Sequence, residues 1–290
     1  MRAKDAKEEE QEQRNERGDF EVDAEEGDQA GSTPSWIKTI DYMKPKGYVA
    51  PPNLNTVPST NIEIEYVYGY RSYDTRNNLR YSTKGEAVYH TAGTGIVLNQ
   101  AKNTMRTTTV HNDDITCLDS WKNLVVTGEM GRRPLIAVWD TDTMEVIVSF
   151  SKPLEKSISN VAFSPSGKYI AATSMSDNHE IAIYDVIKKE LVATGNGPRS
   201  PIFALKFTQE EDKVVCGCAK EIVFANFSSG KGLKLERGIF GKVPIIPTYS
   251  LARVGGYMVS AMGNGNILLW KGNSCTKPLK EHNVAVTALT

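Results

Sequence analysis

A repeat with a period close to 43 residues limits the possible folds of this chain more than any other feature of the sequence. Its first marker is a dipeptide at which an apolar run meets a polar turn. The second residue of that dipeptide falls at positions 99, 140, 185, 226 and 271, at spacings of 41, 45, 41 and 45. A second marker, an apolar residue followed three positions later by another, begins at positions 115, 158, 202, 246 and 286, at spacings of 43, 44, 44 and 40. Because the two markers keep one period, we expect a series of similar structural units that bury their apolar faces by stacking.

Within each unit the residue pattern is that of short β-strands. Apolar and polar residues alternate from Ile62 to Tyr68, and apolar runs occupy residues 124–127, 136–139 and 181–184. No long segment has the 3.6-residue periodicity of a helix, so the pattern is all-β. Units of roughly 40–45 residues with four antiparallel strands are typical of WD propeller blades. The sequence therefore predicts a WD-repeat β-propeller over residues 80–290, incomplete in this chain, with about five blades.

The dipeptide positions are predicted to hold the blades together. Trp139-Asp140 should end the third strand of its blade, with the indole packed between blades and the carboxylate hydrogen-bonded to the following turn. We expect the same structural role for Tyr184, Asp185 and Trp270.

The histidines and cysteines give little indication of catalysis, metal binding or redox activity. His111 and His282 precede the runs at 115 and 286, where WD blades often place a His that bonds to the Asp of the blade and to a Ser or Thr. A catalytic or metal-binding role is the alternative. None of the four cysteines forms a CxxC pair, so we interpret them as reduced, buried thiols, with metal or redox work as the alternative. Because GxSxG, P-loop and HExxH motifs are absent, we expect no enzymatic activity, no cofactor and no metal.

The N-terminal residues differ from the rest in charge. Residues 1–28 contain 5 Lys or Arg against 12 Asp or Glu, a net charge of −7, so the remainder carries +6 of the total of −1. Residues 1–33 are poor in apolar side chains and are predicted to be disordered. The first residues cannot form a signal peptide, and no run approaches the roughly 18 apolar residues of a membrane span. We therefore expect no membrane partner, and no nucleic-acid partner either.

Residues 34–60 combine prolines with a few large apolar side chains, including Trp36, Ile37 and Tyr42. Four prolines in this stretch after Pro34 favour extended structure without a helix. We consider two interpretations of the segment. It is either a plain linker, or an extended tail that lies along a partner and uses those side chains as anchors.

Residues 67–79 read Val-Tyr-Gly-Tyr-Arg-Ser-Tyr-Asp-Thr-Arg-Asn-Asn-Leu. This run resembles the HELP motif of the echinoderm microtubule-associated-protein-like (EMAP-like) family, VYGYRxxDxRNN, which we place in residues 61–79. Residues 111–118 resemble the H-x-D-D-(I/V)-x-C-L run that opens a following blade in that family. The resemblance extends over about residues 62–290. The residues that carry it are Tyr68, Gly69, Tyr70, Arg71, Asp74, Arg76, Asn77, Asn78, His111, Asp113 and Asp114.

The resemblance implies a HELP segment that helps to join and close tandem propellers, and a protein that binds tubulin or microtubules. From the residues alone, two Arg and one Asp beside aromatic side chains indicate a hydrogen-bonded plug at a blade junction, and direct partner contact is the alternative. The +6 body has the right sign for the acidic surface of tubulin. Candidate contacts on the body are Arg132, Arg133, Lys188, Lys189, Lys231, Lys234 and Arg237.

The expected function is thus that of a non-enzymatic structural protein of the cytoplasmic cytoskeleton, bound to microtubules of a ciliary or flagellar axoneme and to other axonemal proteins. The alternative is a WD-repeat adaptor that binds other proteins at the top of its propeller without affinity for tubulin. EMAP-like chains usually run longer, and Thr290 falls inside the expected first strand of a sixth blade. We therefore expect a fragment of a longer protein, or blades supplied from elsewhere. No heptads of a trimerising coiled coil occur in residues 1–60.

Overall fold

The computed structural model describes residues 43, 45–52, 56–57, 59–60, 63–76, 78–227, 232–280 and 282–289. The chain divides into two compact units, Met1–Ile62 and Glu63–Thr290. In the described part of the first unit, the Tyr48 N–H donates to the Pro45 carbonyl at 3.0 Å and closes a turn. The disorder predicted for residues 1–33 and the anchors Trp36, Ile37 and Tyr42 lie outside the described residues.

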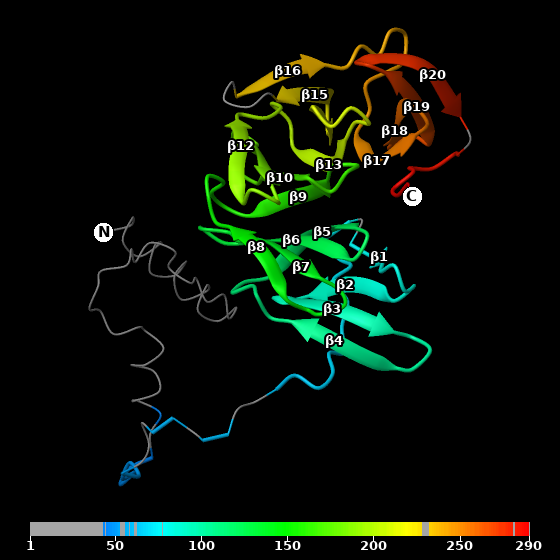
Figure 1. Ribbon diagram of the computed structural model, residues 1–290. Helices are drawn as coiled ribbons and strands as arrows, with labels where there is room; N and C mark the ends of the chain where they lie inside the picture. The colour runs from blue at the N-terminus through cyan, green and yellow to red at the C-terminus, as the bar shows by residue number, and fades with distance from the viewer. Residues whose placement is uncertain are drawn as a thin grey trace, which may run out of the picture. The chain divides into compact units, whose positions relative to one another are not determined.

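The described residues of the second unit form five four-stranded antiparallel sheets, each a meander of consecutive strands. We call them blades 1 to 5 in chain order (Figure 1). Blade 1 contains β1 (Arg80–Tyr81), β2 (Ala87–Thr91), β3 (Thr94–Asn99) and β4 (Thr104–Thr108). Blade 2 contains β5 (Ile115–Trp121), β6 (Leu124–Glu129), β7 (Ile136–Asp140) and β8 (Val146–Phe150). Blade 3 contains β9 (Ile158–Phe163), β10 (Tyr169–Ser174), β11 (Ile181–Asp185) and β12 (Glu190–Gly195). Blade 4 contains β13 (Ile202–Phe207), β14 (Lys213–Cys218), β15 (Ile222–Phe227) and β16 (Leu233–Arg237). Blade 5 contains β17 (Thr248–Val254), β18 (Tyr257–Met262), β19 (Asn266–Lys271) and β20 (Ser274–Lys280).

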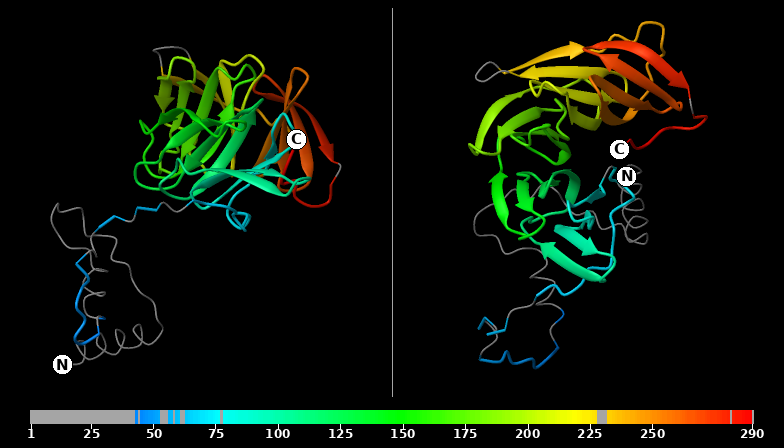
Figure 2. Two further views of the ribbon diagram at one scale, coloured as in Figure 1. Left: turned by 60° about the horizontal axis from the view of Figure 1, so that its bottom comes forward. Right: turned by 45° about the vertical axis from the view of Figure 1, so that its right-hand side comes forward.

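The blades of this unit follow one another around an arc, with the first strands innermost (Figure 2). Strands β5, β9, β13 and β17 form the inner side, each packed against the next. No helix interrupts the strands in residues 78–227 or 232–280. The all-β propeller architecture predicted from the repeat is confirmed.

The core lies between neighbouring blades, as expected for sheets with two apolar faces. Val126 and Val138 of blade 2 share one buried cluster with Ile158 and Ile170 of blade 3. Comparable clusters join blades 1 and 2, blades 3 and 4, and blades 4 and 5. Apolar area removed from water contributes about 25 cal/mol per Å², so stacking of blades supplies most of the stability of each sheet.

A tight turn shows how one blade is fastened to the next. Residues 164–168 connect β9 to β10, and Gly167 adopts φ +76° there. A side chain at Gly167 would collide with the Trp121 ring of blade 2, so this position requires glycine on both counts. The Trp121 indole N–H donates to the Pro165 carbonyl at 2.9 Å.

The predicted strand boundaries agree closely with the structure, with three differences. Strands β3, β7, β11 and β19 end at positions 99, 140, 185 and 271, whereas β15 continues one residue past 226. Strand β17 begins at Thr248 instead of Ile246 because Pro247 lacks the N–H that a strand ladder needs. The expectation of a sixth-blade strand at residues 286–289 is wrong. The Val286 N–H donates to the Met262 carbonyl and the Leu289 N–H to the Ser250 hydroxyl, so these donors go to blade 5.

Candidate functional site

Arg71 ties the HELP segment, residues 67–79, to the start of blade 2. Its Nε and Nη2 donate to the two carboxylate oxygens of Asp74 at 2.7 and 2.6 Å, and its Nη1 donates to Asp114 Oδ2 at 2.7 Å. The Arg71 side chain is only 5 % exposed. The hydrogen bonds that Arg71 donates to Asp74 raise the pKa of Arg71 above its usual value and lower the pKa of Asp74. This bidentate pair fixes the loop in one geometry.

A second set of hydrogen bonds closes the loop on itself. The Thr75 hydroxyl donates to the Arg71 carbonyl at 2.7 Å, and the Asn78 amide donates to the same carbonyl and to the Thr75 hydroxyl. The Tyr70 hydroxyl donates to Asn78 Oδ1 at 2.5 Å. The loop is therefore satisfied internally around Asn78, which is buried.

The remaining motif positions have varied environments. Tyr68 is 91 % exposed, and a side chain at Gly69 would approach the Thr91 hydroxyl to 3.2 Å. Asp113 is exposed and accepts the Asp114 N–H at 2.8 Å. Asn77 lies outside the described residues.

Arg76 points away from the loop, across the inner side of the arc. Its guanidinium carbon lies 5.2 Å from the Phe203 ring centre and 4.7 Å from the Tyr249 ring centre. These rings belong to blades 4 and 5, so Arg76 contacts side chains that lie far along the sequence from the HELP segment. Such stacking is a cation–π contact.

His111 lies in a buried hydrogen-bond network inside blade 2. Its Nε2 is 2.7 Å from the Thr127 hydroxyl, which also accepts the Trp139 indole N–H at 3.2 Å. Its Nδ1 is 2.8 Å from Glu129 Oε2. The expectation of an Asp partner is wrong here: the acid is Glu129, the last residue of β6, which also accepts the Leu135 N–H and so closes the turn to β7. Burial lowers the pKa of His111, and the hydrogen bond to Glu129 opposes that shift.

The dipeptide residues lie where the blades meet their turns. Trp139 is fully buried and packs against Val88 and Val97 of blade 1. Asp140 Oδ1 accepts the N–H groups of Asp142 and Thr143 at 2.7 and 3.2 Å. These contacts are those of a residue that shapes the fold.

Blades 3 and 5 repeat this arrangement in part. Asp185 Oδ1 accepts the N–H groups of Ile187 and Lys188 at 3.0 and 2.8 Å. Tyr184 is buried and donates its hydroxyl to the Lys152 carbonyl at 2.9 Å. The Trp270 indole donates to the Ser260 hydroxyl at 2.9 Å, and His282 is exposed.

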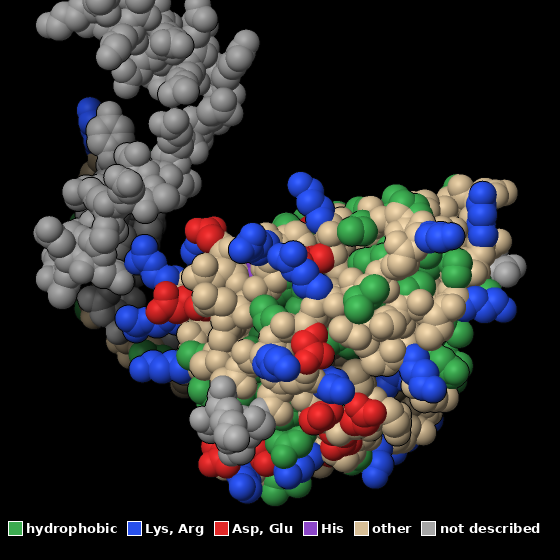
Figure 3. Space-filling view, turned by 90° about the horizontal axis from the view of Figure 1, so that it is seen from above, with side chains coloured by type: hydrophobic (Ala, Val, Ile, Leu, Met, Phe, Trp, Pro, Cys, Tyr) green, Lys and Arg blue, Asp and Glu red, His purple; other side chains and the backbone are tan. Residues whose placement is uncertain are grey.

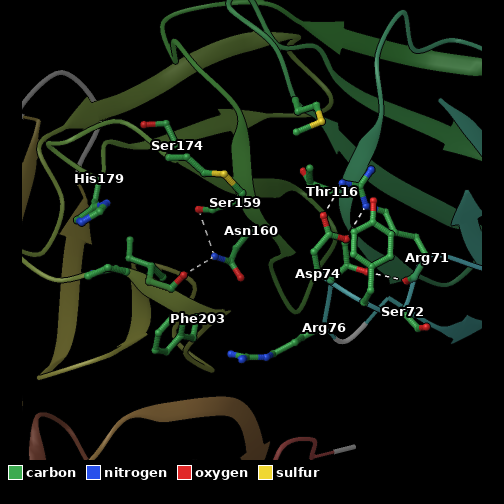
Figure 4. A pocket seen from close by; sticks show the side chains of 16 residues that line it. Arg71, Ser72, Asp74, Arg76, Thr116, Ser159, Asn160, Ser174, His179 and Phe203 are labelled. Carbon is green, nitrogen blue, oxygen red and sulfur yellow. Dashed lines mark hydrogen bonds and ion pairs between the residues drawn. The ribbon is translucent and has the colours of Figure 1, made fainter. Parts of the chain in front are cut away.

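A pocket of about 690 Å³ opens between the HELP segment and the inner strands of blades 2 to 4 (Figure 4). Residues 71–76 form one wall, and residues of β5, β9 and β13 form the other. In Figure 4 the Arg76 side chain extends toward Phe203, and Asn160 lies between the two walls. Met130, Met175 and His179 stand at loops on the rim. The sequence analysis did not predict this pocket.

Asp119 is the centre of a buried charge cluster that sequence reasoning also missed. Its carboxylate accepts from Arg80 Nε at 3.1 Å, from Lys206 Nζ at 3.1 and 3.2 Å, and from the Phe163 N–H at 3.0 Å. Burial by itself would raise the pKa of Asp119, but Lys206 and Arg80 outweigh it and hold the pKa below its usual value. Asp119 and Lys206 are each the fifth residue of the first strand of a blade. A charged residue at this repeat position of a largely buried strand was the sequence signal that could have predicted the cluster.

His90 of β2 is buried without a partner. Neither of its ring nitrogens has a hydrogen-bond partner among the described residues, and the side chain is fully buried. Burial, with Arg71 and His111 nearby, lowers the pKa of His90 to about 4. The ring is therefore neutral at physiological pH.

The predicted basic contacts lie on separate loops. Arg132 and Arg133 are exposed between β6 and β7, and Lys188 and Lys189 are exposed between β11 and β12. Because strand direction alternates within a blade and the first strands run side by side, these two loops lie at opposite ends of their blades. In Figure 3, Lys and Arg side chains are scattered among Asp and Glu over the face shown, without forming one band.

The other predicted basic residues have acidic neighbours or lie outside the description. Lys234 Nζ is 3.2 Å from Glu236, and Arg237 Nε is 3.3 Å from Glu221. Lys231 lies outside the described residues. Lys188 itself is 3.6 Å from Glu190. Exposed pairs of this kind contribute about 0–1 kcal/mol, so they do not hold these side chains firmly.

The cysteines lie in the core or at its edge. Cys117, Cys216 and Cys218 are buried, Cys275 is half-buried, and all four are free thiols. Burial raises the pKa of the Cys117 and Cys216 thiols to about 12. Among the described residues no group of three or more His, Cys, Asp or Glu is arranged to hold a metal ion. In that same part of the chain, no helix is long and apolar enough to cross a membrane.

Two family matches agree with the stacked four-stranded meanders and their repeated dipeptides. Residues 145–185 match the WD domain, G-beta repeat, and residues 57–96 match the HELP motif. The first match runs from the outer strand of blade 2 through the three inner strands of blade 3. The sequence repeat is therefore offset from the blade by one strand. Each repeat contains the outer strand of one blade and the inner strands of the next, so it links successive blades covalently.

Over most of its length the chain is similar to EMAP-like proteins and to a ciliary WD repeat protein. It is 28 % identical to the ciliary WD repeat-containing protein ctxp80 of Euplotoides octocarinatus, over 91 % of this chain and 40 % of that protein. It is 27 % identical to human echinoderm microtubule-associated protein-like 1, over 74 % of this chain and 28 % of the relative. It is 28 % identical to the 77 kDa echinoderm microtubule-associated protein of Strongylocentrotus purpuratus, over 75 % and 34 %. The resemblance seen in the sequence is confirmed, and the chain spans less than half the length of these relatives.

Proposed function

We propose that this chain is a non-enzymatic, microtubule-associated structural protein that binds tubulin through its blades and residues 34–60. The main support is the HELP segment, which Arg71 and Asp114 build into the propeller, together with the similarity of the chain to relatives named for microtubule association. The proposed organisation is an acidic tail at 1–33, a partner-binding segment at 34–60, the HELP motif at 61–79 and blades at 80–290.

The proposed location is the cytoskeleton, at the axoneme of a cilium or flagellum. Its support is the similarity to a protein named as ciliary. Other axonemal proteins are proposed as additional partners, and neither nucleic acid nor membrane is proposed. Residues 1–28, with a net charge of −7, would be repelled by an acidic filament and should point away from it.

The arrangement of basic side chains sharpens the proposal. Because Arg132 and Lys188 lie at opposite ends of the blades, one flat filament surface would engage one of these loops and leave the other exposed. Arg132→Gln with Arg133→Gln, compared with Lys188→Gln with Lys189→Gln, therefore reports which end of the blades faces the filament. Weakened binding in one pair and unchanged binding in the other is the expected result.

Co-pelleting of the full chain with taxol-stabilised microtubules at low and high salt tests the proposal. Binding should weaken as salt rises, because exposed charges are screened within about 8 Å at physiological ionic strength. It should persist in part through apolar contacts of Trp36, Ile37 and Tyr42. A protein that stays in the supernatant at low salt and is absent from isolated axonemes contradicts the proposal.

The pocket between the HELP segment and the inner strands favours a second candidate, a WD-repeat adaptor. Its volume of about 690 Å³ is suited to a short stretch of another protein. On this alternative the chain captures partner proteins in the pocket and does not pellet with microtubules.

A further inference from the structure

Arg76 is the one motif arginine whose charge the HELP segment leaves uncompensated. Arg71 has two carboxylate partners, Asp74 and Asp114. By contrast, the described residues give Arg76 no carboxylate within ion-pair distance, and its side chain is exposed in the pocket. The aromatic rings of Phe203 and Tyr249 hold its guanidinium in place while leaving its N–H donors available.

The positive charge continues inward from Arg76. Arg76 and Asn160 line the pocket and also a narrower cavity of about 50 Å³, which reaches Arg80 and Lys206. Arg80 and Lys206 also both pair with the buried carboxylate of Asp119. Three basic side chains, Arg76, Arg80 and Lys206, thus line this inner cavity.

The acidic groups gather at the Arg71 corner of the pocket, with Asp74 on the same wall as Arg76. Asp74 and Asp114 face Arg71, so that corner carries one excess negative charge. An anionic group would therefore be repelled from the Arg71 side and attracted to the Arg76 side. This asymmetry of charge favours a bound carboxylate at Arg76.

The uncharged side chains that line the pocket fit a polypeptide. A small anion would not need the apolar surface that they offer. Met130, Met175 and Phe203 offer apolar surface, and Met175 is 50 % exposed. The Asn160 amide donates to the Ile202 carbonyl at 3.1 Å, which leaves its Oδ1 as an acceptor for a peptide N–H. Flexible methionines beside a few fixed polar groups are common where proteins bind extended peptides.

We propose that this pocket binds an acidic segment of a partner protein, with a glutamate or aspartate carboxylate on Arg76 and a neighbouring apolar side chain against Met130, Met175 and Phe203. The inference rests on the proposed function only in that the acidic surface of tubulin would supply such a segment. The site and its chemistry stand without that identity.

Fluorescence anisotropy of the full chain with a labelled short peptide of glutamates around one phenylalanine tests the site. Arg76→Gln should weaken binding about tenfold, which equals about 1.4 kcal/mol, because it removes the charged donor to the carboxylate. Lys102→Gln, which removes one positive charge from the exposed β3–β4 turn, is the matched control and should bind like the wild type. Arg76→Lys keeps the charge, and partial binding is expected if the flat stacking contributes.

Three results would overturn the assignment. The first is equal binding of the same peptide with glutamine in place of glutamate. The second is equal binding by properly folded Arg76→Gln. The third is full competition by inorganic phosphate at a concentration equal to that of the peptide, which would indicate a small-anion site.

Microtubule co-pelleting of the same variants separates this inference from the proposed function. Loss of peptide binding with unchanged pelleting means that the pocket serves another acidic partner. Tight peptide binding by a chain that never pellets means that the site stands and the microtubule proposal fails.

Discussion

Arg71 and Asp114 are 43 residues apart in the chain, and their side chains are joined by a 2.7 Å hydrogen bond. That separation equals one repeat. The HELP segment therefore meets blade 2 at the same separation in sequence at which one repeat meets the next. The Arg71 side chain is buried, whereas the Asp74 and Asp114 side chains are each 41 % exposed. The ion pairs thus sit at the wall of the pocket, half in solvent.

Removing the Arg71 charge should loosen the HELP segment. Arg71→Met leaves Asp74 and Asp114 without their cation, and we expect the free energy of unfolding to fall by about 2–4 kcal/mol. The estimate is lower than for a fully buried pair because both carboxylates reach water. Urea denaturation measures the change, with Asp113→Asn as the control at an exposed neighbour. A change of less than about 0.5 kcal/mol in Arg71→Met would contradict the plug role.

Trp139 should be among the largest single contributors to stability. Trp139→Ala removes a fully buried indole between blades 1 and 2 together with its bond to Thr127, and should cost about 3–5 kcal/mol. Thermal unfolding followed by circular dichroism measures it. Tyr68→Ala, at a side chain that is 91 % exposed, is the matched aromatic control. Equal melting temperatures for the two variants would show that the blade 1–blade 2 interface is not where stability lies.

His90 makes the fold sensitive to mild acid. Its pKa is about 4 in the folded protein and near 6.5 when unfolded, so the unfolded state binds more protons between these values. Stability is therefore fully present above about pH 6.5 and falls as pH drops toward 4, by up to about 3 kcal/mol from this group. His90→Leu should flatten that part of the stability–pH curve. His282→Leu, at an exposed ring, should leave it unchanged.

The salt-resistant part of microtubule binding should depend on residues 34–60. Trp36→Ala combined with Tyr42→Ala removes two apolar anchors without altering charge. At low salt we expect a modest loss in co-pelleting, and at high salt nearly complete loss, since screening weakens only the charged contacts. Lys46→Gln in the same segment provides the opposite control, with an effect at low salt alone. Identical salt curves for wild type and the double variant would argue for a plain linker.

Part of the fold could be predicted from residues that are neighbours in the sequence. The ends of β3, β7, β11 and β19 follow from dipeptides in which an apolar run stops at a turn residue, and such signals need only neighbours in sequence. Strand β17 begins later than its marker at Ile246 because the marker does not take account of Pro247. The sequence by itself thus determined the fold class, the repeat and most strand ends.

The long-range partners were decided only by the tertiary structure. Glu129 in place of an Asp beside His111, the 87-residue separation of Lys206 from Asp119, and the crossing of Arg76 to Phe203 all join different strands or blades. Strand periodicity tells which face a side chain takes, but not which residue of another strand or blade stands opposite it. That choice depends on how the blades pack around the arc, because packing sets the distances over which hydrogen bonds and ion pairs form.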